Sequence, residues 1–198
     1  MIDAKFNHII ISINISNDIR PRSKENEEDN FITQVIVNNN VKSISEYTCS
    51  KWKALKWVIF KEPYSLKSID KFDFYQCSSL KQISIPSSVT QIGYSAFSEC
   101  SSLEQILIPN SVTKISNLAF CGCSSLKQIT IPSSVTEIGS SAFKNCISLI
   151  QVSIFSSKIQ IEPKAFDGCS SLKQITCPIP LKKSYLGIPS STSIIIKK

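Results

Sequence analysis

The sequence has only five glycines and a single histidine among its 198 residues, and both shortages exclude kinds of chemistry. Five scattered glycines leave no glycine-rich loop that could cradle a phosphate group. The one histidine, His8, lies near the N-terminus, and no serine–histidine–acid or cysteine–histidine arrangement is supported. The sequence therefore predicts a protein that is not an enzyme, with no catalytic residues and no bound cofactor.

Long apolar runs are also missing. No segment approaches the roughly 20 uninterrupted apolar residues of a membrane-spanning helix. The N-terminal stretch is a poor secretory signal, because it carries Asp3, its apolar run is broken by Ser12 and Asn14, and no small-residue cleavage site follows. We expect a complete chain of this kind to be cytoplasmic, whereas a fragment of an exported protein would lie at the cell surface and look the same.

What the sequence has in abundance is repetition. The stretch CSSLKQISIPSSVTQIGYSAF, which begins at Cys77, returns almost unchanged from Cys100 and from Cys123. Four apolar columns keep a step of 23 residues: Cys77, Cys100, Cys123, Cys146 and Cys169; Leu80, Leu103, Leu126, Leu149 and Leu172; Ile83, Ile106, Ile129, Val152 and Ile175; Phe97, Phe120, Phe143 and Phe166. Such a period predicts a solenoid, in which each repeat forms one coil stacked on the previous one.

Weaker copies extend the array towards the N-terminus. Residues 55–77 fit the pattern with two extra residues near Pro63. Residues 32–49 fit it with Cys49 in the phenylalanine column, and Trp52 then falls in the cysteine column. We therefore predict three segments: an N-terminal cap strand and charged loop (1–31), the solenoid (32–179), and a C-terminal capping segment (180–198) that ends in a closing strand.

The columns also predict the path of one coil. In SLKQITIP, Leu126 and Ile129 point inward while Gln128 and Thr130 point outward, as the two-residue period of a strand requires. Pro132 ends the strand because it has no N–H group for the ladder. The next residues turn the corner, and SAFKNC is expected to form one short helical or 3₁₀ turn. Glycine recurs just before that turn, but other residues share its position, so a positive φ there stays open.

The repeat resembles the leucine-rich repeat of the BspA-like family. The motif LxxIxIPxSVTxIGxxAFxxCSS carries the resemblance at 80–102, 103–125 and, with Ile147 in place of one serine, 126–148. The next repeat departs from it, since Phe155 replaces the proline and Lys158 the valine. The resemblance implies a leucine-rich-repeat-like solenoid, β-rich, with a parallel sheet on one side and short helical or 3₁₀ turns on the other. It also implies no catalysis, and many members are microbial surface proteins that bind host or matrix proteins.

The cysteines predict neither a metal site nor disulfides. Four-cysteine zinc sites need pairs such as Cys-x₂-Cys, and the only close pair here, Cys121 and Cys123, has one residue between its members. In-register coils lie roughly 4.8 Å apart with parallel side chains, whereas a disulfide needs converging β-carbons about 3.5–4.5 Å apart. We expect free thiols in the core, which agrees with a reducing compartment.

The outward positions of the strands form the candidate partner-binding face. Its members are Gln82, Ser84, Gln105, Leu107, Gln128, Thr130, Gln151, Ser153, Gln174 and Thr176, and Gln34 aligns with the glutamines. Two interpretations stay open. The glutamines form an amide ladder that stabilises the stack, or they form a flat, polar and nearly uncharged binding surface.

The charge of the chain adds a second candidate surface. The formal net charge is +7, and the lysines are spread widely. Along one edge of the outward face the order is Lys81, Glu104, Lys127, Ile150 and Lys173. Nucleic acid is disfavoured, because it needs a clustered basic stripe with stacking aromatics, and Trp52 falls in a core column.

Three functions stay open on the sequence alone. The first is a non-enzymatic module that binds protein partners through the strand face. The second is a structural component whose basic surface docks on an acidic protein or filament, such as a cytoskeletal one. The third is a cell-surface, adhesin-like protein or fragment of one.

Overall fold

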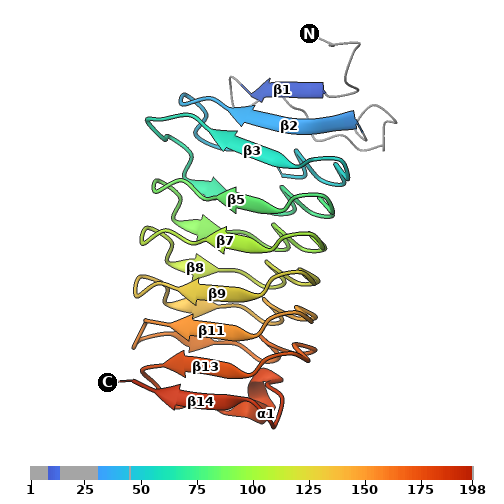
Figure 1. The fold of residues 1–198 in the computed structure, drawn as a ribbon. Coiled ribbons are helices and arrows are strands. Elements are labelled where there is room, and N and C mark those ends of the chain that lie inside the picture. Colours follow the sequence, from blue (N-terminus) through green and yellow to red (C-terminus); the bar gives the residue numbers. More distant parts are fainter. Residues whose placement is uncertain (1–8, 14–30, 45, 198) are drawn as a thin grey trace.

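The computed structural model describes residues 9–13, 31–44 and 46–197. They form a solenoid of about seven turns, in which the strands of successive coils stack along the length of the molecule (Figure 1). The predicted repeat solenoid is confirmed. The predicted charged loop and His8 lie outside the described residues, and the boundaries of the three predicted segments stay a prediction.

One side of the solenoid is a stack of long parallel strands. They are β1 (Ile9–Ile13), β2 (Ile32–Val37), β3 (Trp57–Phe60), β5 (Gln82–Ser84), β7 (Gln105–Leu107), β9 (Gln128–Ile131), β11 (Gln151–Ile154), β13 (Gln174–Cys177) and β14 (Ser193–Ile196). Ladders join β1–β2–β3, β5–β7 and β9–β11–β13–β14. Gln128 pairs with Gln151, and Ile131 with Ile154, so equivalent residues of the repeats lie side by side.

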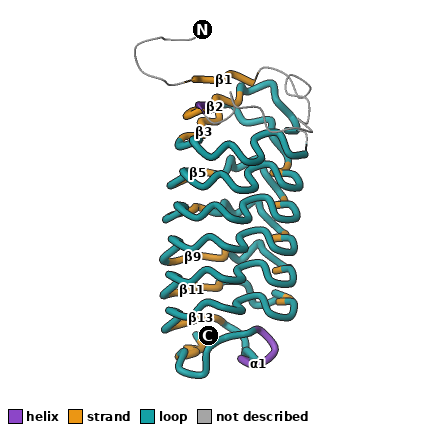
Figure 2. The backbone as a smooth tube through the Cα atoms, turned by 90° about the vertical axis from the view of Figure 1, so that its right-hand side faces the viewer, coloured by secondary structure: helices purple, strands orange, loops and turns teal. Residues whose placement is uncertain are grey.

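A second parallel sheet, which the sequence did not predict, lies on the opposite side of the coils (Figure 2). Its strands are β4 (Ser68–Ile69), β6 (Gln91–Ile92), β8 (Lys114–Ile115), β10 (Glu137–Ile138) and β12 (Gln160–Ile161). Each has only two residues, too few to show the alternation that marks a strand. The segment that the sequence indicated as a corner therefore contains a short strand, because its backbone pairs with the equivalent segment of the next coil.

The third side of each coil is a run of turns instead of the expected helical or 3₁₀ turn. Within one coil the Ser98 N–H donates to the Ser95 carbonyl (3.1 Å), but the Phe97 N–H donates to the Ala119 carbonyl of the next coil (2.8 Å). This alternation needs left-handed backbone at Ser95 (φ 51°) and Glu99 (φ 62°). A helical turn would direct each N–H along its own coil and leave the neighbouring coil's carbonyls unpaired.

The left-handed positions recur in two columns, and only two of the recurring residues are glycine. The columns are Phe72, Ser95, Leu118, Ser141 and Lys164, and Gln76, Glu99, Gly122, Asn145 and Gly168. Left-handed backbone costs an L-residue roughly 1–2 kcal/mol, so the inter-coil hydrogen bonds must offset that strain. Gly93, where φ was left open, lacks a positive φ; a Cβ there would lie 2.8 Å from the Asp70 carbonyl carbon.

The phenylalanine column is a continuous stack of rings in the core. Phe74, Phe97, Phe120, Phe143 and Phe166 are fully buried. Successive ring centroids lie 5.3–5.5 Å apart, with interplanar angles of 7° or less. Each ring therefore stabilises the coil on either side of it, which a lone repeat could not achieve.

The cysteine column consists of free thiols that act as hydrogen-bond donors. The Cys123 Sγ lies 3.2 Å from the Phe97 carbonyl of the preceding coil, and the same contact recurs at Cys77, Cys100, Cys146 and Cys169. Burial raises the pKa of the Cys100 thiol to about 12, so it keeps the proton that it donates. All eight cysteines are free, as the sequence indicated.

The C-terminal coil changes shape where its backbone pairs with the coil of Phe166. α1 (Lys183–Leu186) replaces the run of turns, and the Phe166 N–H donates to the Leu186 carbonyl (2.9 Å). Leu186 is buried, and its carbonyl takes the place of the alanine carbonyls that accept the same hydrogen bond in earlier coils, such as that of Ala165. β14 then pairs with β13 and completes the long-strand side.

Candidate interaction surface

The ten residues of the predicted face lie together on the outer side of the long strands. Gln82 pairs with Gln105 in one ladder, and Gln128, Gln151 and Gln174 pair in register in the next. The residues two positions later in each strand form a second column beside the glutamines, and we call both columns the strand face. Its members from β5 to β9 are exposed, while Ser153, Gln174 and Thr176 are half-buried.

The glutamines of the strand face do not form an amide ladder. Among the residues that the structure describes, their side chains make no hydrogen bonds with one another. Gln174 donates from Nε2 to Thr176 Oγ1 of its own strand (3.2 Å). Gln105, Gln128 and Gln151 are exposed and keep their amide groups available to solvent or to a partner.

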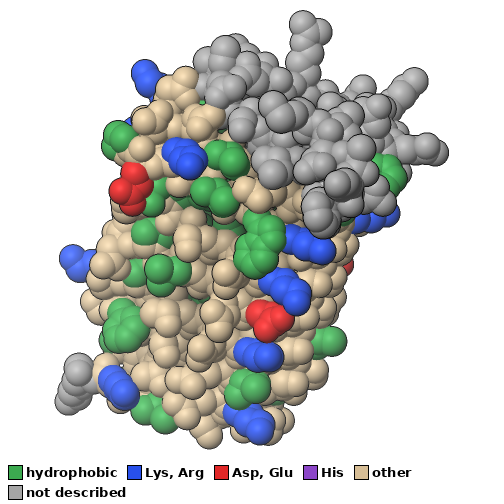
Figure 3. Space-filling model, turned by 45° about the horizontal axis from the view of Figure 1, so that its top comes forward, with side chains coloured by type: hydrophobic (Ala, Val, Ile, Leu, Met, Phe, Trp, Pro, Cys, Tyr) green, Lys and Arg blue, Asp and Glu red, His purple; other side chains and the backbone are tan. Residues whose placement is uncertain are grey.

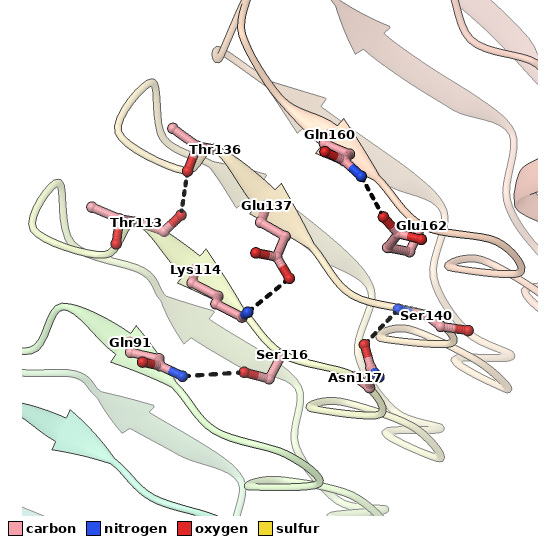
Figure 4. A network of polar contacts seen from close by, with 10 residues as sticks. All are labelled: Gln91, Thr113, Lys114, Ser116, Asn117, Thr136, Glu137, Ser140, Gln160 and Glu162. Atoms are coloured by element: carbon pink, nitrogen blue, oxygen red, sulfur yellow. Dashed lines mark hydrogen bonds and ion pairs between the residues drawn. The ribbon is translucent and has the colours of Figure 1, made fainter.

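Polar residues of the same kinds on the second-sheet side are paired, as Figure 4 shows. The Lys114 Nζ lies 2.9 Å from the Glu137 Oε1. Gln160 donates to Glu162 (2.6 Å), and Thr136 Oγ1 donates to the Thr113 carbonyl of the preceding coil (3.2 Å). The second-sheet side therefore uses its polar groups within the chain, whereas the strand face leaves the amides of Gln105, Gln128 and Gln151 open.

Two apolar residues of β3 belong to the strand face and were not predicted. Trp57 pairs with Gln34, and Ile59 with Ile36, so both continue the outward columns. Their side chains are 48% and 41% exposed. The repeat pattern did not reveal them because of the two extra residues near Pro63. These place Trp57 25 residues before Gln82, instead of the usual 23.

A line of lysines borders the strand face. Lys56, Lys81, Lys127 and Lys173 each precede a long strand, and we call them the lysine line. Backbone hydrogen bonds join some neighbouring positions along this border, from the Glu104 N–H to the Lys81 carbonyl (2.9 Å) and from the Ile150 N–H to the Lys127 carbonyl (2.8 Å). In Figure 3 basic side chains follow one another along one side of the face, interrupted by acidic and apolar ones. In the sequence Glu104 and Ile150 occupy the corresponding positions, and the Glu104 Oε2 lies 3.8 Å from the Lys127 Nζ.

A further exposed aromatic cluster lies on the turn side of the first coils. The rings of Tyr47 and Phe72 stack at 4.7 Å, and Tyr75 and Tyr94 meet Phe72 edge-on at 5.4 and 5.3 Å. Lys71 places its Nζ 5.8 Å from the Phe72 ring centroid. These groups already pack on one another, so the cluster stabilises the irregular first coils.

Among the described residues, histidine, cysteine and acidic side chains form no group of three or more that could hold a metal ion. Within the same residues there is no helix long and apolar enough to cross a membrane.

Among the described residues, Asp73 is a carboxyl group with a strongly shifted pKa, and it is enclosed in the core. It occupies the column that holds Ala96 and Ala119 in later coils, and it is fully buried. Its Oδ2 accepts a hydrogen bond from the Asp70 N–H (2.7 Å), while its Oδ1 has no partner. Burial raises the pKa of Asp73 well above its ordinary value, and the nearby charges of Asp70 and Glu46 raise it further. A group without solvent access cannot meet a substrate, so Asp73 has a structural role.

The raised pKa of Asp73 predicts a stability that falls with increasing pH. Below about pH 4 the folded and unfolded chains both keep the proton. Above that pH only the folded chain keeps it, so the free energy of unfolding falls by up to about 1.4 kcal/mol per pH unit until the folded-state pKa is passed. Asp73→Asn removes the titrating carboxyl group, so the stability of this variant relative to the natural protein is expected to rise with pH.

Urea unfolding of both proteins at several pH values measures this difference. Glu99→Gln, at an exposed carboxyl group of the next coil, controls for the loss of one negative charge. A difference between Asp73→Asn and the natural protein that stays constant with pH would contradict the assignment.

Fold and surface together define a parallel β-solenoid repeat protein with one open polar face. The chain belongs to the BspA type leucine rich repeat region family, whose model matches residues 26–149 and 101–194 in 6 copies. A search of curated proteins finds no match. The family comprises repeat proteins rather than enzymes.

Three bacterial leucine-rich repeat proteins of known structure share the fold. The protein of T. pallidum is 22% identical, with a TM-score of 0.72 over 84% of this chain and 78% of that one. A protein of Eubacterium ventriosum is 20% identical, with a TM-score of 0.55 over 84% of this chain and 49% of that one. A leucine rich cell surface protein of Faecalibacterium prausnitzii is 22% identical, with a TM-score of 0.54 over 94% of this chain and 65% of that one.

Proposed function

We propose that the protein is a non-enzymatic interaction module that binds another protein through the strand face. The observation that supports it is the contrast between two polar surfaces. Gln105, Gln128 and Gln151 expose unpaired amides in adjacent strands, whereas Gln160 and Lys114 on the second-sheet side are paired. Buried or structural polar groups are normally satisfied within the chain, so open, aligned amides suit an external partner.

The size of the face also fits this role. A specific protein interface buries about 800 Å² on each partner, which is more than one coil can offer. The paired strands β5–β7 and β9–β11–β13–β14 present equivalent residues over several coils, as extended solenoid surfaces do. The description of the F. prausnitzii relative as a cell surface protein supports an adhesin-like role at a cell surface as the alternative setting.

Arginine at Gln128 and Thr130 should abolish most of the binding. The double variant Gln128→Arg and Thr130→Arg places two long side chains at the centre of the strand face, where their bulk prevents close contact with a partner of either charge, without changing the core. Partners are first captured from native lysate and identified by mass spectrometry, and the affinity of each is then measured with purified proteins. We expect at least a tenfold loss, about 1.4 kcal/mol, with an unchanged melting curve.

A matched pair on the other side is the control. Thr90→Arg and Gln91→Arg adds the same charges at exposed positions of the second-sheet side. This variant should bind normally. Normal binding by the strand-face variant, or equal losses in both variants, would argue against the strand face as the binding surface.

A further inference from the structure

We propose that the strand face binds an extended acidic protein segment, which the lysine line holds by charge and Trp57 and Ile59 anchor by apolar contact. The inference rests on the proposed function and names the class of partner that the same surface takes.

The first argument is the charge at the border of the face. The four residues of the lysine line are all positively charged. The acidic residue between them in the repeat order, Glu104, lies 3.8 Å from the Lys127 Nζ. All four lysine side chains are exposed, so the carboxylates of a partner can reach them. A potential of one sign along an interface steers a partner of the opposite sign and disfavours partners of the same sign.

The second argument is the apolar group at the N-terminal end of the face. Trp57 and Ile59 occupy columns that hold glutamine, serine or threonine in most other coils, so the fold does not require apolar residues there. Leu107, 69% exposed, continues the second column two strands away. Tryptophan is enriched among residues that contribute most to binding. Because Lys56 immediately precedes Trp57, apolar and charged contacts converge at this end.

The third argument is spacing. Adjacent coils lie 5.3–5.5 Å apart in the ring stack. Lys81, Lys127 and Lys173 are two coils apart, so at roughly 4.8 Å per strand they repeat about every 10 Å along the strand face. A segment in the extended polyproline II conformation, which has three residues per turn and rises about 3.1 Å per residue, covers about that distance in three residues and keeps every third side chain on the same side. A segment lying across the strands could therefore bring an acidic side chain to each of these lysines. The open glutamine amides beside them can donate to and accept from its backbone.

A labelled peptide tests the proposal on the full chain. The probe carries glutamate at every third position in a glycine–serine background and a Leu-Phe pair at one end, and fluorescence anisotropy measures its binding. The variant Lys81→Glu, Lys127→Glu and Lys173→Glu should bind at least tenfold more weakly, as should Trp57→Gln. Raising the salt from about 0.1 to about 1 M shortens the Debye length from about 10 to about 3 Å, so the natural protein should also bind more weakly.

Matched controls separate the lysine line from net charge. Lys42→Glu, Lys67→Glu and Lys158→Glu changes the net charge equally at exposed positions outside the strand face, and it should bind within about threefold of the natural protein. The neutral triple variant with glutamine at Lys81, Lys127 and Lys173 gives the same comparison if the glutamate variant folds poorly.

Three outcomes overturn the proposal: no binding of the acidic peptide by the natural protein, equal losses in the two triple variants, or tighter binding of single-stranded DNA than of the peptide. The lysate experiment distinguishes a failure of this proposal from a failure of the proposed function. If Gln128→Arg with Thr130→Arg loses the captured partner while the lysine-line variant retains it, the strand face remains the binding surface and only the class of partner is wrong.

Discussion

Replacing Phe120 by alanine is expected to destabilise the protein by about 3–5 kcal/mol. The Phe120 ring is fully buried between those of Phe97 and Phe143, at centroid distances of 5.4 and 5.3 Å. The coil of each flanking ring is held by backbone hydrogen bonds to its neighbouring coil, such as that from the Phe97 N–H to the Ala119 carbonyl (2.8 Å). The cavity therefore cannot close by a small shift. Equilibrium urea unfolding followed by circular dichroism gives the change.

Phe155→Ala is the matched control for Phe120→Ala. Phe155 is 64% exposed, at the position where other repeats carry the strand-ending proline. Its removal should change the free energy of unfolding by no more than about 0.5 kcal/mol. Similar losses at Phe120 and Phe155 would show that the ring stack is not a principal source of stability. A shallower denaturant slope for Phe120→Ala would show that the coils on its two sides unfold separately.

Replacing Ile129 by alanine is expected to cost about 2–5 kcal/mol. Ile129 lies in β9, pairs with Val152 of β11 and is buried in the middle of the array. Its neighbour Gln128 points to the opposite side of the strand and is exposed, so Gln128→Ala should cost no more than about 0.5 kcal/mol. Urea unfolding of the two variants measures both values under the same conditions.

A third variant separates side-chain chemistry from position. Ile147→Ala removes the same atoms as Ile129→Ala, but Ile147 is 50% exposed in a turn. It should behave like Gln128→Ala. Because a slip of one residue would exchange the two faces of a strand, equal costs at Ile129 and Gln128 would refute the register of β9.

The 23-residue step predicted the core because burial is specified by residue type. Leu126, Phe143 and Cys146 are buried as the columns indicated. The same reasoning holds in the degenerate first coil, where Cys49 and Trp52 were assigned to core columns and are buried. An apolar residue that returns at every step is favoured in the interior of the solenoid, where it is removed from water and packs on its equivalents in the neighbouring coils.

The candidate surface was predicted in part. The alternation in strands such as β9 and β11 placed ten outward residues on one face. Trp57, Ile59 and Lys56 were missed, because the insertion near Pro63 breaks the step on which the columns depend. The sequence also left open whether the glutamines bind one another, since that depends on side-chain geometry between neighbouring coils.

By itself, the sequence determined the solenoid, its period, its inward columns and its free thiols. Only the tertiary structure decided the second sheet and the left-handed turns at residues such as Leu118 and Lys164, where side-chain preference gives no warning. The reason is that nearly every residue carries the same backbone donor and acceptor, so residue type does not record which groups will pair. The partner of each N–H becomes defined only when the next coil is in place, and in this fold that partner is often 23 residues away.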